Sequence, residues 1–181
     1  PNRTEESVKN ALQRLSSPTK RVLDYFFWFD LASPSDEKAF ECIKTKDYKE
    51  AIALWSSEAG TSAKGLIAKK NLAILYSALL LSHDNQSYLR KSVQIWIELL
   101  GDDKYWASFI KLYKLNDDLG TSDSVIEEFS KDVPKHLSDF YTTLSKVHND
   151  NNYTLTFNES FAIKGTQVQK DLELIFESIN D

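Results

Sequence analysis

Methionine is absent from the 181 residues, and cysteine occurs once. A single cysteine cannot close a disulfide within the chain or build a thiolate cluster for zinc, so we expect neither. Cys42 stands among apolar residues of a predicted helix, which indicates a small buried side chain. A reducing setting is compatible with this usage, and we expect a cytoplasmic protein. Because the chain opens on Pro1 without methionine, we also expect it to be a piece of a longer protein.

Glycine and proline are scarce as well, with 5 and 4 occurrences. Since both residues punctuate turns, their scarcity favours long helices with few connections. Long apolar runs are also lacking. The longest run, Leu72 to Leu81, is about half the length that a membrane-spanning helix needs. We therefore expect no transmembrane helix and no membrane partner.

Clustered positive charge is missing too. The net charge is −5, and residues 91–181 carry 9 basic against 16 acidic side chains. Binding to a phosphate backbone needs a basic stripe or patch. We therefore expect no nucleic-acid partner.

Patterns typical of catalysis or metal binding do not occur. His83 and His148 stand alone, and His136 near Asp132 and Asp139 is interpreted as a solvated helix face. Phosphate-binding glycine loops and nucleophile motifs are absent from the sequence. The acidic pairs fall at helix starts or on polar faces, where they interact with helix dipoles and water. We expect no enzyme, no cofactor and no metal.

Apolar residues recur at helical spacing along nearly the whole chain, which predicts an all-α fold of antiparallel helical hairpins. The one strand-like alternation, residues 153–157, has no partner strand and is interpreted as extended chain or as the lead-in to a helix. The predicted helices cover residues 4–15, 18–30, 35–45, 47–59, 63–83, 87–100, a segment between Asp102 and Gly120, 122–131, 134–148, and a last segment within 158–179.

Serine and proline mark two of the predicted helix starts. Ser17 is a good N-cap with Pro18 in the first turn, and Ser35 is predicted to cap the helix that follows. In the same way Pro134 is predicted to open a new helix. Aromatic residues around Trp28 indicate burial on most sides of the helix at 18–30. We expect core positions for at least three of the four tryptophans, Trp28, Trp55, Trp96 and Trp106.

Two segments resemble the helical hairpins of tetratricopeptide repeats. In the first, the turn Lys46-Asp47-Tyr48 is followed by Ala51 and Trp55, and Ala39 stands where the first helix of a repeat carries a small contact residue. In the second, Leu72-Ala73 and Tyr76 resemble the first helix, and Ser92 and Trp96 the second. Small residues admit a neighbouring helix, and the aromatic fills the groove beside it. Lys46 and Glu58 depart from the family pattern, and the second hairpin is longer than the family spacing.

A narrower resemblance concerns the stretch Leu15-Ser-Ser-Pro-Thr-Lys-Arg21. It is similar to the end of J-domains, which commonly reads Leu-Ser-Asp-Pro-x-x-Arg. The His-Pro-Asp tripeptide by which J-domains stimulate their Hsp70 partner does not occur in this sequence. The resemblance implies a helical region that follows the J-domain of a bacterial J-domain protein.

These patterns together predict one helical domain, residues 1–181. It comprises N-terminal helices at 1–31, which are the end of a J-like domain if that resemblance holds. Residues 35–120 form two degenerate hairpins and a further helix. Residues 121–181 form the C-terminal capping helices. The fold predicted is a short tetratricopeptide-like solenoid with helical caps.

The function expected of such a fold is non-catalytic binding of a protein or peptide, as in the partner-binding part of a J-domain cochaperone. The alternative is a structural domain that mediates self-association or orders a neighbouring domain. The resemblance places four side chains in a concave groove: Phe40, Lys44, Lys70 and Ile74. Phe40 and Ile74 replace the asparagines of a carboxylate clamp, so a partner with apolar side chains is expected. Burial of both residues by adjacent helices is the other interpretation.

Overall fold

The computed structural model describes residues 6, 9 and 16–160, and all regular secondary structure in these residues is helical. The all-α prediction is thus confirmed for the described part of the chain. The predicted helix at 4–15 falls almost wholly outside it, as do residues 161–179 of the last predicted helix. The helices are α2 (Pro18–Phe26), α3 (Pro34–Lys44), α4 (Tyr48–Glu58), α5 (Ala63–Leu80), α6 (Gln86–Leu100), α7 (Asp103–Asn116), α8 (Asp123–His148) and a helix at residues 152–160.

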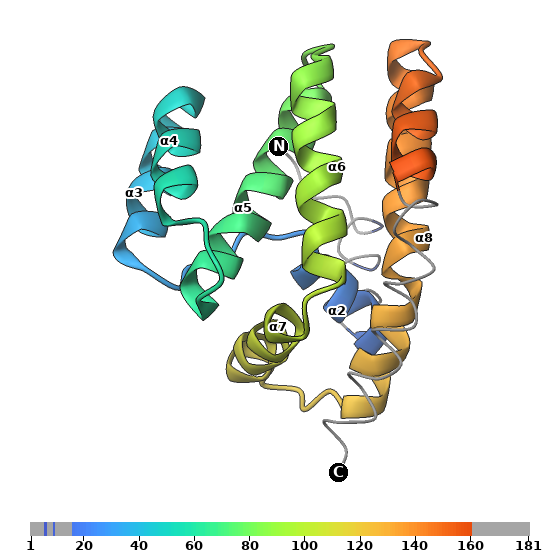
Figure 1. The fold of residues 1–181 in the computed structure, drawn as a ribbon. Coiled ribbons are helices and arrows are strands. Elements are labelled where there is room, and N and C mark those ends of the chain that lie inside the picture. The colour runs from blue at the N-terminus through green and yellow to red at the C-terminus, as the bar shows by residue number, and fades with distance from the viewer. Residues whose placement is uncertain (1–5, 7–8, 10–15, 161–181) are drawn as a thin grey trace.

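The helices are arranged as neighbouring pairs (Figure 1). α3 packs against α4 and α5 packs against α6, and these pairs are the two hairpins that the sequence predicts. α4 also packs on α5, which joins the pairs, while α7 contacts α5 and α6 at one end. α2 lies against α8. Paired packing is established by these contacts, whereas a tetratricopeptide-like solenoid stays a prediction.

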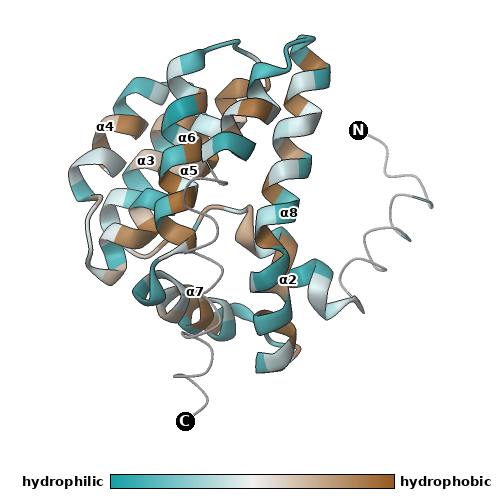
Figure 2. Ribbon diagram, turned by 45° about the vertical axis from the view of Figure 1, so that its right-hand side comes forward, coloured by the Kyte–Doolittle hydropathy of each residue, from teal (hydrophilic) through white to brown (hydrophobic). Residues whose placement is uncertain are grey.

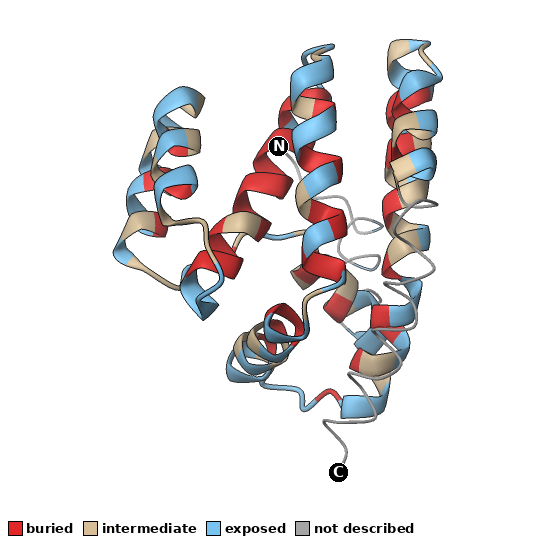
Figure 3. Cartoon of the chain, viewed as in Figure 1, coloured by how far each residue is buried: buried red, intermediate tan, exposed pale blue. Residues whose placement is uncertain are grey.

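Helix α5 is the central element, because 14 of its 18 residues are buried. Figure 3 shows this burial along nearly its whole length. One face of α5, with Ala68, Leu72 and Leu75, packs with α3 and α4 in the smaller hydrophobic cluster. Another face, with Ala73 and Ile74, belongs to the larger cluster, formed with α2, α6, α7, α8 and residues 152–160. A helix that is apolar nearly all round is expected at such a place.

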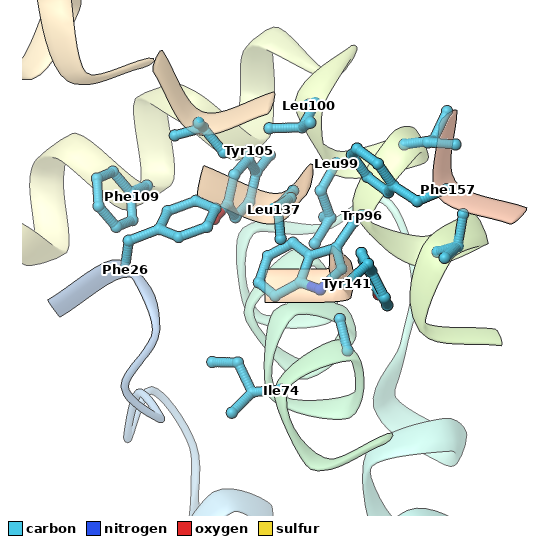
Figure 4. Close-up of a cluster of buried hydrophobic side chains, with 14 of the residues drawn as sticks. Phe26, Ile74, Trp96, Leu99, Leu100, Tyr105, Phe109, Leu137, Tyr141 and Phe157 are labelled. Atoms are coloured by element: carbon cyan, nitrogen blue, oxygen red, sulfur yellow. The ribbon is translucent and has the colours of Figure 1, made fainter. Parts of the chain in front are cut away.

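Aromatic rings fill the larger cluster (Figure 4). The Phe26 ring stacks on Trp96 at a centroid distance of 5.1 Å and on Trp106 at 6.2 Å. Trp55 is fully buried in the smaller cluster. The expectation that at least three tryptophans are core residues is confirmed by Trp55, Trp96 and Trp106.

The start of α2 is as predicted, but the start of α3 is not. Ser17 caps α2 with Pro18 in its first turn. The N-cap of α3 is Ser33 rather than Ser35, and Pro34 stands at the first helical position. Ser33 and Asp36 form a reciprocal capping box, which satisfies two backbone donors together. Because proline prefers the first turn of a helix, α3 begins at Pro34 and its N-cap is the residue before it.

Two further boundaries differ from the sequence prediction. α8 continues through Pro134 as one helix, where the sequence predicted two. Val133 and Leu137 are buried beside the proline, so packing outweighs the missing hydrogen bond. Residues 153–157 are helical. Tyr153 and Phe157 alternate as in a strand, but their spacing of four residues also fits one face of a helix, and both are buried.

Candidate partner-binding surface

The segment between α2 and α3, residues 27–33, is fixed to α5 by a buried ion pair. The Lys70 ammonium lies 2.6 Å from the Asp30 carboxylate and has no exposed surface. It also donates to the carbonyl oxygens of Trp28, at 2.8 Å, and Tyr25, at 3.4 Å. All three donors of the ammonium are therefore used to hold this turn of the chain.

Asn71, the next residue of α5, binds the backbone of the same segment twice. Its amide donates to the carbonyl oxygen of Asp30 at 2.8 Å, and its side-chain oxygen accepts from the Asp30 N–H at 3.0 Å. The Asn71 amide also donates to Asp36 at 3.1 Å, and the Trp55 indole donates to the same carboxylate at 2.7 Å. Asp36 in turn accepts from the N–H groups of Ala32 and Ser33. The network fixes backbone from Trp28 to Ser33.

The electrostatics of this network fit a structural role. Burial lowers the pKa of Lys70, and the Asp30 carboxylate opposes that shift. The pKa of Tyr25 is raised by burial and then by Asp30. The Lys70 ammonium also lies 5.1 Å from the centre of the Tyr25 ring, a cation–π distance. Because the ion pair is enclosed and hydrogen-bonded, it stabilises the segment and offers no reactive group to solvent.

Two large apolar side chains project from this fixed segment into solvent. Trp28 is 66% exposed and Leu31 is 61% exposed. The helix predicted at 18–30 ends at Phe26, so Trp28 lies beyond it and is the one tryptophan outside the core.

Trp28 stands at the rim of a groove between α2 and α8. The volume of the groove is about 700 Å³. In Figure 2 the two helices lie side by side with teal and brown residues on both. The groove is lined by Leu23, Asp24, Phe27 and Trp28 from α2 and the segment after it, and by His136, Asp139, Phe140 and Thr143 from α8.

Contacts outside the groove hold α2 and α8, the two helices that form it. The Arg21 guanidinium donates to the Thr121 hydroxyl at 3.0 Å and lies 3.5 Å from the Asp117 carboxylate. Burial alone would raise the pKa of Asp117, but hydrogen bonds from Thr121 and Leu119 and the Arg21 charge lower it. These contacts fasten α2 to the connection between α7 and α8. On α8 the His136 ring stacks on Phe129 at 6.1 Å, which fixes its direction.

The four side chains predicted to line a concave groove do not share one surface. Lys70 and Ile74 are buried in this structure, and for Ile74 this is the interpretation in which adjacent helices cover the side chain. The hydrogen bonds of Lys70 and the apolar packing of Ile74 in the larger cluster account for this. Phe40 is half-buried against Phe29 and Trp55, with centroid distances of 5.2 and 6.4 Å. Lys44 is exposed and pairs with Glu41 on its own helix.

Other kinds of site find no support in the part of the chain that the structure describes. No group of three or more potential metal ligands occurs there. None of the described helices is both long and apolar enough to cross a membrane. Cys42 is partly exposed, so the prediction of a fully buried side chain is wrong. Burial and nearby acidic residues raise the pKa of its thiol, which disfavours the reactive thiolate.

Comparisons with known proteins give no further assignment. No protein-family model, no curated protein and no solved structure matches this chain.

Proposed function

We propose that this chain is a non-catalytic protein-binding scaffold and that the groove between α2 and α8, with Trp28 at its rim, is the binding surface. The observation that carries the proposal is the contrast at Trp28. Its backbone carbonyl is held by a buried lysine, yet 66% of the residue is exposed. Tryptophan is strongly enriched among the residues that dominate binding energies.

The fixed backbone supports this role. A side chain on a preorganised segment loses less conformational entropy on binding than one on a mobile loop. Trp28 and Leu31 are both presented in this way, and Trp28 lines the same groove as the half-buried rings of Phe27 and Phe140. Apolar surface surrounded by polar residues is typical of protein interaction sites.

A finer proposal concerns the cellular setting. The resemblance of residues 15–21 to the end of a J-domain favours the partner-binding part of a cytoplasmic cochaperone. Sequencing of the gene upstream of Pro1 tests this directly. A His-Pro-Asp tripeptide between helical segments in about 60 preceding residues supports it, and a start codon just upstream of Pro1 contradicts it.

The binding role is tested by photo-crosslinking in cell extract. A benzophenone amino acid is placed at Thr143, which lines the groove, or at exposed Lys111 on α7 as the matched control. We expect a defined adduct from position 143 and none from position 111. The crosslinked protein is identified by mass spectrometry and purified for measurement of its affinity.

The purified partner is then titrated against three proteins. Trp28→Ala is expected to raise its Kd about 30-fold, as for a hot-spot residue of about 2 kcal/mol. Leu115→Ala, which alters a side chain 71% exposed on α7, should leave it unchanged. Equal affinities for wild type and Trp28→Ala contradict the proposal. A concentration-dependent dimer that Trp28→Ala dissociates would instead support the self-association alternative.

A further inference from the structure

We infer that the groove between α2 and α8 binds a peptide segment of another protein that carries a bulky apolar side chain and, within about one helical turn, a lysine or arginine. This rests on the proposed function and adds the chemistry of the partner.

The apolar side chain of the partner is recognised by the apolar residues that line the groove. Leu23, Phe27 and Phe140 are each half-buried, so their rings and methyl groups are only partly covered by the protein itself. An inserted apolar side chain would remove the remaining area from water, which is favourable by about 25 cal/mol per Å². A groove of about 700 Å³ is large enough for a leucine, phenylalanine or tryptophan side chain and the neighbouring backbone.

The basic half comes from charge complementarity. The Asp139 carboxylate lines the groove from α8, and no lysine or arginine is among the described residues that line it. The exposed indole of Trp28 lines the same groove, and tryptophan is the best cation–π partner. A lysine or arginine of the partner can therefore meet a carboxylate and an aromatic face together. Complementary charge of this kind governs specificity and the rate of association.

Three other occupants make different predictions. A second copy of the chain would produce a dimer that depends on Trp28. An acidic segment would be repelled by Asp139. The third is the part of this chain before α2, which carries the apolar residues Val8 and Leu12. If that part bound in the groove, added peptides would be blocked.

The test is selection of random 12-residue peptides displayed on phage, using the full chain as bait and discarding binders that also bind Trp28→Ala. We expect the survivors to share a large apolar residue with lysine or arginine three or four positions away. Synthetic copies of the best peptide are measured by anisotropy against wild type, Asp139→Lys and Glu128→Lys. Glu128 is exposed on the same helix, makes the same charge change and is not among the lining residues.

Asp139→Lys should weaken binding of the basic peptide at least tenfold, whereas Glu128→Lys should change it less than twofold. A peptide with its basic residue replaced by glutamate should bind Asp139→Lys more tightly than wild type. Peptides that depend on Trp28 but lack a basic residue and ignore Asp139→Lys overturn this inference and leave the proposed function standing.

Failure of the proposed function has a different signature. If selection yields no peptide that depends on Trp28, both the function and the inference are rejected for this groove. If peptides bind only after Leu12→Asp, the groove is occupied by the chain itself and the inference is overturned. Sedimentation of wild type and Trp28→Ala identifies a second copy, which overturns it as well.

Discussion

The α3–α4 hairpin and the body formed by α2 and α5–α8 are stabilised in different ways. The body has a continuous aromatic core, with Phe26 in contact with Trp96, Trp106 and Phe109. The hairpin contributes only a few fully buried residues, and its one large core ring, Trp55, is also a hydrogen-bond donor to Asp36. The body depends on apolar packing, whereas the hairpin depends also on a polar network. The network joins the two regions at α5.

The largest effect is expected for Trp96→Ala. The indole is almost fully buried and stacks on Phe26, so its removal should lower the free energy of unfolding by about 5 kcal/mol. Urea denaturation followed by circular dichroism measures the loss. A decrease below about 1 kcal/mol would mean that Trp96 does not belong to a packed core.

Lys70→Met tests the network that joins the regions. The substitution leaves the buried Asp30 carboxylate without its cation, and we expect a loss of about 4 kcal/mol. Lys70→Met combined with Asp30→Asn should recover about half of this loss. Lys69→Met is the control, because Lys69 pairs with Glu98 at the surface, where a pair contributes about 0.5 kcal/mol. Equal losses for Lys69 and Lys70 would show that the buried pair is not special.

Trp55→Ala should cost about 3 kcal/mol, near the lower end for a large core aromatic. The small cluster can open locally, which limits the loss measured for the whole domain. In Trp55→Ala, amide hydrogen exchange should be faster than in the wild type in α3 and α4, and less changed in α6 and α8. An equal increase in the exchange rate over all helices would mean that the hairpin and the body unfold as one unit.

Alkaline unfolding separates packing from polar effects. Burial raises the pKa of Tyr141 to about 12, and the hydrogen bond with Ser92 only partly offsets this. Since its pKa in the folded protein exceeds the ordinary value of about 10, the stabilisation is complete below pH 10. It is lost as the pH rises from 10 to 12. Burial shifts the pKa of Tyr105 in the same direction.

Tyr141→Phe should make the loss of stability above pH 10 less steep by as much as about 1.4 kcal/mol per pH unit. At pH 7 it should cost only about 1 kcal/mol, the usual value of one hydrogen bond. The lowered pKa of Lys70 acts with the opposite sign, because stability recovers as the buried lysine loses its proton. An unchanged slope in Tyr141→Phe would show that this phenol does not titrate with unfolding.

The smallest effect is expected for Trp28→Ala, which should change stability by less than about 0.5 kcal/mol because the side chain is largely in water. Thermal unfolding measures it. A loss comparable with that of Trp55→Ala would mean that Trp28 is packed in solution, and the proposed binding surface would be withdrawn.

The parts of the fold that sequence predicts well are those set by local periodicity. The helical spacing of apolar residues in α6 and the Ser17–Pro18 start of α2 are local features, and the structure confirms them. Continuation of α8 through Pro134 depends on burial of Val133 and Leu137 against other helices. That packing is not visible in a local window, so two helices were predicted.

The proposed binding surface was harder to predict for a similar reason. A lysine in an apolar helix resembles a groove residue until its partner is known, and Asp30 lies 40 residues away. Trp28 resembles a core aromatic because Phe26, Phe27 and Phe29 surround it in sequence. Its exposure depends on where α2 ends, which the contacts of Lys70 and Asn71 determine.

The position of α5 between the two clusters has a consequence for how the chain can be divided. Ala68, Leu72 and Leu75 face the hairpin, while Ala73 and Ile74 face the body. A shortened chain that begins at Ala63 would leave the first of these faces uncovered and would also lack Asp30, the counter-ion of Lys70. Such a fragment should aggregate or recruit the α3–α4 hairpin of another molecule. The two regions can differ in stability, but neither is expected to fold without α5.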